Sequence, residues 1–287
     1  MRYTTSAAFR QALEERLRQR EQQTGEPLVR LRKRVVFERC MARLQKEKNS
    51  PWVLKGGFAL ELRLGERARV TKDLDLGVDL GYFNSTEVSS AGVARKLRED
   101  LSAAAMDHFA FVVPESGEEE LGIPGLKSYR YAVEARLDGR RFEAIRVDVG
   151  LGDPLISPFD ELTGSDLLSF AGISPATIRT TSRAQHFSEK VHALTRPFED
   201  RINTRVKDLA DIMLLMKLGL PDESTVTSAV REIFKSRGTH GIPNRIEIPP
   251  VAWVATYSAV ATNLNLQEAT IESAIERLNN YWTELFS

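Results

Sequence analysis

The sequence has very little cysteine and histidine, and it lacks any long apolar run. Its 287 residues include one cysteine, Cys40, and four histidines. A single cysteine excludes an internal disulfide framework, and so few scattered histidines argue against a zinc site. No run reaches the roughly 18 to 20 apolar residues that a membrane span needs, and the N-terminus lacks the apolar stretch of a secretory signal. We therefore expect a cytoplasmic protein that does not enter a membrane.

The composition is that of an ordinary soluble globular protein, with 42% hydrophobic and 28% charged residues. This length suits one large domain or two lobes that share a cleft. The net charge is zero, but residues 1–49 carry 13 basic side chains against 6 acidic ones. A basic segment on an acidic body can hold a polyanion. The alternative is a pair of solvated, arginine-rich helices.

Apolar periodicity divides the chain into an α/β part and a helical part. In the first part, helices are predicted at 5–22, 27–48, 58–64 and 86–107. Strands are predicted at 52–54, 69–78, 109–113, 128–137 and 141–150, the last two joined by a hairpin turn at Asp138-Gly139. In the second part, helices are predicted at 183–195, 204–217, 222–236, 251–263 and 267–285. We expect three units, namely basic helices at 1–49 that pack on an α/β lobe at 50–181, and a helical lobe at 182–287.

Three aspartates on the predicted strands are the sharpest chemical signal. Side chains alternate along a strand, so Asp73 and Asp75 share one face while Leu74 and Leu76 face the core. Asp148 has the same placement in its own strand. Neighbouring carboxylates repel each other unless a cation lies between them, and Mg²⁺ is bound by carboxylates together with substrate phosphates. Three such carboxylates could hold two divalent ions. The alternative interpretation is that Asp73 and Asp75 lie on a solvated strand face without a function.

A pair of glycines, Gly56 and Gly57, follows the strand predicted at 52–54. Glycine lets backbone N–H groups approach a phosphate closely. A glycine turn upstream of paired carboxylates therefore indicates nucleotide chemistry.

The order of five short motifs resembles that of a known enzyme family. The motifs are KGG at 55–57, RVTKDLDL at 69–76, IRVDVG at 145–150, KVHALTR at 190–196 and RVKDLAD at 205–211. The first three resemble the polymerase-β-type nucleotidyltransferase superfamily. The last two narrow the resemblance to the AbiEii/AbiGii toxin family, which includes the MenT-like toxins. The resemblance covers residues 50–217.

The resemblance implies an α+β fold with a polymerase-β-like nucleotidyltransferase lobe, made of a mixed sheet and helices, plus a helical C-terminal lobe. It implies a Mg²⁺-dependent enzyme that transfers NMP from an NTP to the 3′ end of tRNA and so blocks translation. The implied partner is a cognate antitoxin protein, because the family belongs to toxin–antitoxin and phage-defence modules. The implied catalytic residues are Asp73, Asp75 and Asp148, which are also the metal ligands, together with Lys190 and Asp208. The implied nucleotide-binding residues are Lys55, Gly56, Gly57, Thr71, Lys190 and Arg196.

Four of these positions have a second interpretation. Many superfamily members have serine where this chain has Gly57, so phosphate contacts there are expected from the backbone alone. Thr71 stands where related toxins have a residue that can be phosphorylated, but it is also a β-favouring residue. Lys190 could instead be a lysine that covers an apolar stripe. Asp208 could be a base, an anchor for Lys190, or the partner of Arg205 in a helical ion pair.

Two other functions remain open at this stage. One is a nucleotidyltransferase that acts on a protein or a small molecule, and the other is a non-catalytic RNA-binding module with this fold. The intact DxD pair argues against the second, and the basic N-terminal helices favour RNA as acceptor. We expect Arg30, Arg34 and Lys48 to contact RNA phosphates. His186 and His192 are expected to be structural.

Overall fold

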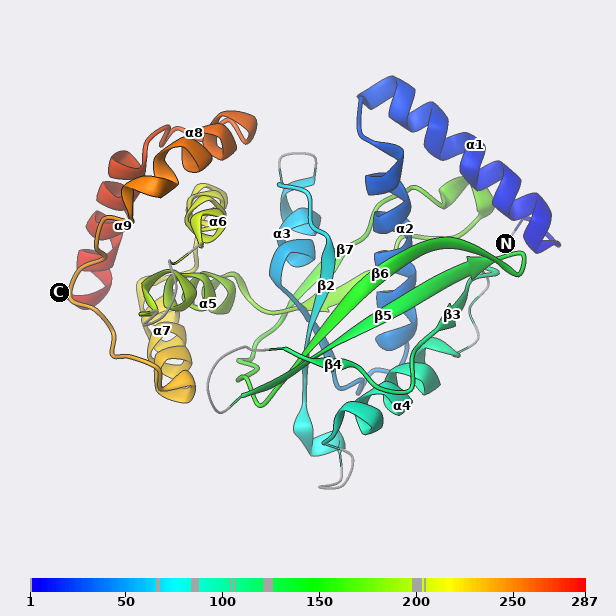
Figure 1. The fold of residues 1–287 in the computed structure, drawn as a ribbon, viewed down its shortest axis with the longest axis horizontal. Helices are drawn as coiled ribbons and strands as arrows, with labels where there is room; N and C mark the ends of the chain where they lie inside the picture. The colour runs from blue at the N-terminus through cyan, green and yellow to red at the C-terminus, as the bar shows by residue number, and fades with distance from the viewer. Residues whose placement is uncertain are drawn as a thin grey trace.

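The computed structural model describes residues 2–65, 68–83, 88–103, 105, 107–120, 126–197, 203 and 205–287. Its α-helices are α1 Ser6–Thr24, α2 Leu28–Leu44, α3 Gly56–Leu64, α4 Ser90–Leu101, α5 Arg183–Thr195, α6 Val206–Leu218, α7 Glu223–Arg237, α8 Val254–Asn263 and α9 Ile271–Phe286. Its strands are β1 Trp52–Lys55, β2 Asp73–Val78, β3 Ala110–Val112, β4 Glu118–Glu119, β5 Lys127–Leu137, β6 Arg140–Leu151, β7 Asp160–Thr163 and β8 Thr177–Thr180. Figure 1 shows these elements as an α/β lobe beside a helical lobe.

The strands of the described residues form one mixed sheet. Their order is β3-β5-β6-β2-β1-β8-β7, with β4 paired to β5. β2 runs parallel to β6 and β1 runs parallel to β8, whereas the other neighbours are antiparallel. The predicted hairpin turn is present, since Asp138 and Gly139 both have positive φ between β5 and β6. The predicted α+β fold is therefore confirmed.

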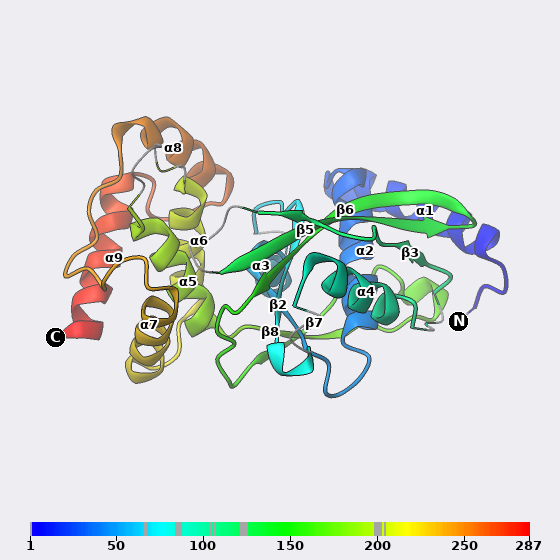
Figure 2. The same cartoon turned by 60° about the horizontal axis from the view of Figure 1, so that its bottom comes forward.

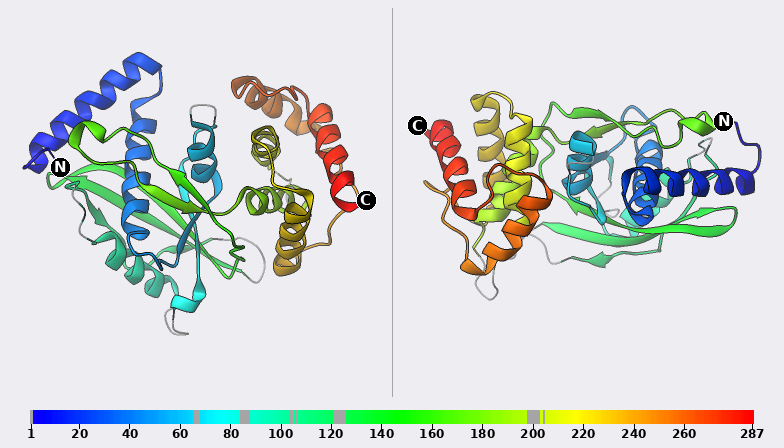
Figure 3. Two further views of the ribbon diagram at one scale, coloured as in Figure 1. Left: turned by 180° about the vertical axis from the view of Figure 1, so that it is seen from behind. Right: turned by 90° about the horizontal axis from the view of Figure 1, so that it is seen from above.

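The apolar face of the sheet is covered by helices. Alternation along β2 and β6 turns Leu76 and Val149 to this face, where they join one continuous core. Phe37 on α2 and Phe58 on α3 pack against each other in the same core, with ring centroids 5.0 Å apart. Cys40 is fully buried there, as expected of a small core residue. In the right panel of Figure 3, α1, α2 and α3 all lie on one side of the β5–β6 ribbon.

The helices α5 to α9 (Figure 2) build a second core, to which Leu60 and Leu64 of α3 also belong. Helical spacing predicts four aromatic core residues here, of which Trp253, Tyr257 and Trp282 are buried and Tyr281 is half-buried against the same core. The segment 238–250 between α7 and α8 has no helix or strand, as predicted. None of the described helices is long and apolar enough to cross a bilayer.

Some element boundaries differ from those predicted. Strand β2 begins at Asp73 and not at residue 69, so Thr71 precedes the strand. Helix α4 covers 90–101 of the predicted 86–107, and residues 86, 87, 104 and 106 lie outside the described residues. The turn-rich stretch 151–181 contains β7 and β8, which the prediction missed because each has a single apolar residue, Leu162 or Ile178. The three successive glutamates at 118–120 predict a solvated loop, but Glu118 and Glu119 form the short strand β4.

The arginines of α2 are largely buried against carboxylates. Arg43 donates to both oxygens of Asp107, at 2.8 and 2.5 Å, and Arg39 lies 3.6 Å from the same carboxylate. All three side chains are under a tenth exposed. Burying charges is costly unless they are paired, so this cluster has to remain intact for α2 to pack on the sheet.

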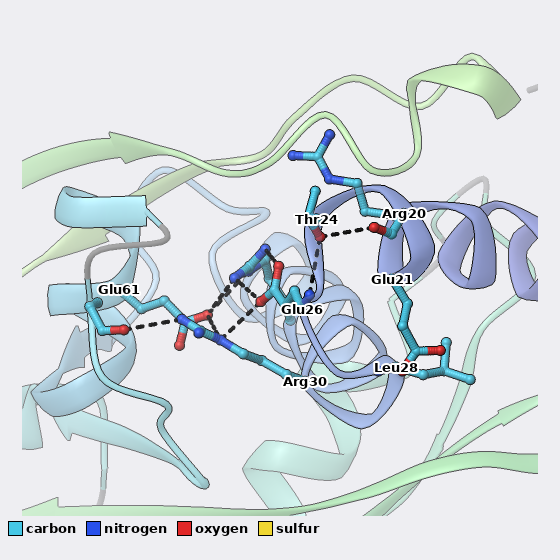
Figure 4. Close-up of polar contacts among 9 residues, drawn as sticks. Arg20, Glu21, Thr24, Glu26, Leu28, Arg30 and Glu61 are labelled. Atoms are coloured by element: carbon cyan, nitrogen blue, oxygen red, sulfur yellow. Dashed lines mark hydrogen bonds and ion pairs between the residues drawn. The ribbon is translucent and has the colours of Figure 1, made fainter. Parts of the chain in front are cut away.

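Two further α2 arginines are held by the network of Figure 4. Arg30 lies 2.9 Å from Glu26 and 3.5 Å from Glu61, which belongs to α3. Arg34 contacts the same two glutamates at 2.5 and 3.0 Å. The expectation that Arg30 and Arg34 contact RNA phosphates is therefore wrong, because intramolecular carboxylates already neutralise both. Lys48 is exposed, as expected.

Replacing Asp107 by alanine should destabilise the protein strongly. Arg39 and Arg43 would then be buried without their carboxylate, which costs about 3–5 kcal/mol. A matched control is Glu99→Ala on α4, where Arg95 lies 4.0 Å away and both side chains are more than half exposed. That change should alter the unfolding free energy by less than about 0.5 kcal/mol. Urea denaturation measures both values, and equal losses in the two variants would contradict the expectation.

Candidate active site

The site is built on a row of charged side chains that crosses four neighbouring strands. Residues that face each other in register share one side of the sheet. In this row Lys55 on β1 is opposite Asp75 on β2, Asp75 is opposite Asp148 on β6, and Asp148 is opposite Arg130 on β5. The two predicted carboxylates therefore lie side by side with a cation at each end of the row.

The acidity of Asp75 is strongly perturbed. Burial, reinforced by the negative charge of Asp148, raises its pKa from 3.8 to about 6. Lys190 and the N–H of Gly57, which donates to Asp75 Oδ2 over 3.4 Å, act in the opposite direction. Gly56 has φ +61°, and a Cβ there would lie 2.0 Å from the same oxygen. The first glycine of the turn is therefore required by the carboxylate that packs on it.

The second glycine faces Thr71. A Cβ at Gly57 would lie 2.6 Å from Thr71 Oγ1. Thr71 is only 7% exposed, and its hydroxyl donates to the carbonyl oxygen of Asp73 over 3.3 Å. A serine in place of Gly57 would require Thr71 to move, which explains this departure from the superfamily pattern.

Lys190 on α5 is held by two carboxylates of α6. Its Nζ lies 2.6 Å from Asp208 and 2.9 Å from Asp211. Although burial opposes it, the attraction of these two anions raises the pKa of Lys190 above its ordinary value. Arg69, ahead of β2, binds both oxygens of Asp211 at 2.8 Å. Despite burial, Lys190 and Arg69 lower the pKa of Asp211 to about 2. Of the interpretations left open for Asp208, this geometry favours an anchor for Lys190, and the predicted pair with Arg205 is also present at 3.4 Å.

Lys55 is engaged between the lobes and is not free for a phosphate. Its Nζ donates to Asp153 over 2.6 Å and lies 2.7 Å from Glu189 on α5. Arg237, the last residue of α7, binds both oxygens of Asp153 at 2.9 and 2.7 Å. Lys55 and Arg237 together hold the pKa of Asp153 well below its usual range, against the effect of burial. Sequence reasoning missed Asp153, Glu189 and Arg237, because none of them lies at a motif position.

A cleft of about 340 Å³ between the lobes collects most of the predicted residues. Seven of the ten predicted site residues line it, and they are Lys55, Gly56, Asp75, Asp148, Lys190, Arg196 and Asp208. Asp73, Gly57 and Thr71 lie next to these residues but do not line it. Arg205, whose side chain is 49% exposed, also lines the cleft.

The histidines of α5 line the same cleft and are buried. Burial, together with Lys190 and Arg63, holds the pKa of His186 well below its ordinary value. Burial and Arg237 lower the pKa of His192 to about 3, and its Nε2 lies 3.0 Å from Thr239 Oγ1. Both rings are therefore neutral near pH 7, which fits the structural role expected for them.

The fit of these residues to a divalent cation differs along the row. Asp73 Oδ1 is buried without a hydrogen-bond partner among the described residues, and Arg146 is 3.8 Å from it. Asp148 is different, because Arg130 binds both of its oxygens at 2.8 and 2.7 Å. In the described part of the chain, no three His, Cys, Asp or Glu side chains are grouped as a ready-made metal centre. Asp73 and Asp75 therefore fit a cation as they stand, whereas Asp148 fits one only if Arg130 moves.

Comparison with known proteins places this geometry in a family. Residues 39–286 match the family described as nucleotidyl transferase AbiEii toxin, type IV toxin–antitoxin system. Among solved structures, MenT4, a nucleotidyltransferase toxin from Mycobacterium tuberculosis, is 17% identical with a TM-score of 0.56, covering 96% of this chain and 99% of that one. An antigenic nucleotidyltransferase-like protein from Paracoccidioides brasiliensis is 15% identical with a TM-score of 0.42, covering 71% and 88%. No curated protein matches the chain.

The family match covers most of the chain, and its nucleotidyltransferase activity agrees with the cleft that Asp75 of the DxD pair and Lys190 line together. The fold similarity to MenT4 extends over nearly the whole length of both chains. The chain belongs to the AbiEii nucleotidyltransferase toxin family.

Proposed function

We propose that this toxin transfers NMP from an NTP to the 3′ hydroxyl of an RNA, with tRNA as the acceptor, and that a cognate antitoxin neutralises it. The observation that supports the transfer best is the meeting of Asp75 on the sheet and Lys190 on the helical lobe in one cleft. Blocked translation is the expected consequence, because a tRNA whose 3′ end carries extra nucleotides cannot be charged. Phage defence is the biological setting that the family suggests.

In this proposal Asp73 and Asp75 would hold Mg²⁺, and Asp148 would be available as a further ligand only without its bonds to Arg130. The bound cation would activate the attacking hydroxyl and offset the charge that develops on the phosphates. The Gly56–Gly57 turn offers backbone N–H groups to the NTP, since no side-chain hydroxyl is present there. Thr71 supports the glycine turn by packing on Gly57. Lys55 supports the cleft by bridging the two lobes.

Lys190 is proposed to neutralise the triphosphate as a positive point charge. Asp208 and Asp211 hold its ammonium in the cleft before substrate binds, so little reorganisation is needed on binding. Arg196 and Arg205 line the same cleft, which supports a contact of each with phosphate oxygens. Transfer to a protein or a small molecule remains the second candidate, and incubation with labelled NTPs and total RNA separates the two.

Asp73→Asn and Asp75→Asn should each abolish transfer while the protein stays folded. Asparagine keeps the size of the side chain but removes the charge that a divalent cation needs. The control is Asp79→Asn at the end of β2, where the carboxylate caps a turn and does not line the cleft. Transfer of labelled NMP to RNA is the measurement, and full activity in Asp75→Asn would exclude the proposed metal ligands.

Asp75 should also make the stability of the metal-free protein depend on pH. Its pKa is raised to about 6 in the folded protein, so the folded state binds this proton more tightly than the unfolded state. The free energy of unfolding should therefore fall as the pH rises from about 4 to about 6. In EDTA at pH 7.5, Asp75→Asn should be more stable than the wild type by about 1–3 kcal/mol, and this difference should vanish near pH 4.

Adding Mg²⁺ to the wild type at pH 7.5 should recover part of that stability, because only the folded state holds the ligands together. The same addition should leave Asp75→Asn almost unchanged. Urea denaturation followed by circular dichroism measures both effects. If Mg²⁺ stabilised the two proteins equally, the cation would have to bind elsewhere.

Lys190→Met and Asp208→Asn should each lower transfer by about 10²–10³-fold, the usual loss when one preorganised charge is removed from an active site. Lys96→Met is the matched control, because Lys96 also pairs with a carboxylate, Asp100, at 2.8 Å but lies on α4. The rate of single-turnover transfer at saturating NTP is the measurement. Normal rates in Lys190→Met would show that another cation serves the triphosphate.

A further inference from the structure

The face of the sheet that carries the candidate site continues over the β5–β6 hairpin. Side chains on this face are half-buried or exposed, in contrast to the buried residues that alternate with them. Their cross-strand pairs are Ser128 with Gly150, Arg130 with Asp148, Ala132 with Arg146, and Glu134 with Ala144. Small residues thus alternate with charged ones. Only the arginine and acidic side chains project from this face.

Arg146 is the cation of this face that is best placed to meet a ligand. Its side chain is 60% exposed, and it is opposite Asp73 in the register of β2 and β6. Across the hairpin it is opposite Ala132, which is too small to cover it. A bound polymer that extends from Asp73 along β6 would therefore contact the guanidinium of Arg146 first.

More positive charge follows toward the end of the hairpin. Arg136 is opposite Arg141 and its side chain is 46% exposed, whereas Arg140 next to the turn is opposite Leu137 and belongs to the other face. Residues two apart on a strand are separated by about 6.8 Å, so these guanidinium groups can follow a polyanion along the strands. Glu134 opposes them, and it is paired with Arg136 at 2.5 Å.

We propose that the uncovered face of β5 and β6 binds the 3′-terminal strand of the acceptor RNA through its phosphates, with Arg146 as the contact nearest the reacting end. This inference rests on the proposed transfer to RNA and identifies the surface that the RNA follows. Charge complementarity and continuity with the cleft support this ligand. The four pairs contain no aromatic side chain on which a base could stack, so the contact recognises phosphates and carries no base specificity.

The basic N-terminal segment serves this surface indirectly. Arg10 on α1 donates to the carbonyl oxygens of Leu137, Arg140 and Arg141 at 2.8, 3.1 and 3.0 Å. These bonds hold the end of the hairpin from the opposite side of the sheet. The N-terminal helix thereby supports the exposed arginines at the turn of the hairpin.

The test compares Arg146→Ala with Arg95→Ala, which removes a half-exposed arginine from α4 on the covered side of the sheet. With tRNA as acceptor, Arg146→Ala should raise the KM for tRNA roughly three- to tenfold and leave the KM for NTP unchanged. The slope of log affinity for tRNA against log salt should fall by about 0.7 to 0.9. Arg95→Ala should match the wild type in all three measurements.

A second variant tests the surface by gain of affinity. Glu134→Gln removes the opposing acid and releases Arg136, so tRNA should bind more tightly than to the wild type. An Arg146→Ala protein with unchanged KM for tRNA, or with a changed KM for NTP alone, would overturn the inference. A wild-type protein that labels no RNA at all would instead overturn the proposed function.

Discussion

The parallel register of β2 and β6 is the constraint on which the site depends, because it puts Asp75 directly opposite Asp148. Two carboxylates in this position repel each other and raise the cost of ionising Asp75. Cations partly offset this repulsion. Lys55 and Arg130 lie at the two ends of the row, and Lys190 comes from the other lobe. The pKa of Asp75 stays raised despite these cations, so a divalent cation beside it would lower the remaining cost of its ionisation.

The same ion pairs that surround the row also hold the two lobes against each other. Lys55 contacts Glu189, Arg69 contacts Asp211, and Arg237 contacts Asp153, and each pair joins the α/β lobe to the helical lobe. Buried pairs of this kind contribute little net stability, because desolvation offsets their attraction. Their effect is on geometry, because these ion pairs form only when the two lobes are correctly positioned relative to each other. These pairs act beside the apolar contact that Leu60 and Leu64 of α3 make with the core of the helical lobe.

The positive charge of residues 1–49 illustrates how composition can mislead. Counted along the chain, this segment is a candidate for binding a polyanion. In the folded protein, Arg30, Arg34, Arg39 and Arg43 are paired with buried carboxylates. Their role is to allow a charged helix to pack under a sheet. Exposed cations near the candidate site instead include Arg205, which lines the cleft, and Arg146 on β6.

Local sequence determined the parts of this protein that depend on neighbouring residues. Alternation placed Asp73 and Asp75 on one face, the Asp138-Gly139 turn paired β5 with β6, and the motifs indicated Lys190 and Asp208. Tertiary structure alone decided which charged side chains pair with each other, because the paired residues are distant in the sequence. Lys55 and Asp153 are 98 residues apart and Asp153 and Arg237 are 84 apart. The strands β7 and β8 are likewise defined by pairing, since a strand with a single apolar residue carries too little pattern until β8 lies beside β1. The sequence pattern of a strand predicts which face of the sheet a side chain lies on. The partners of that side chain depend on strand register and on the packing of the two lobes.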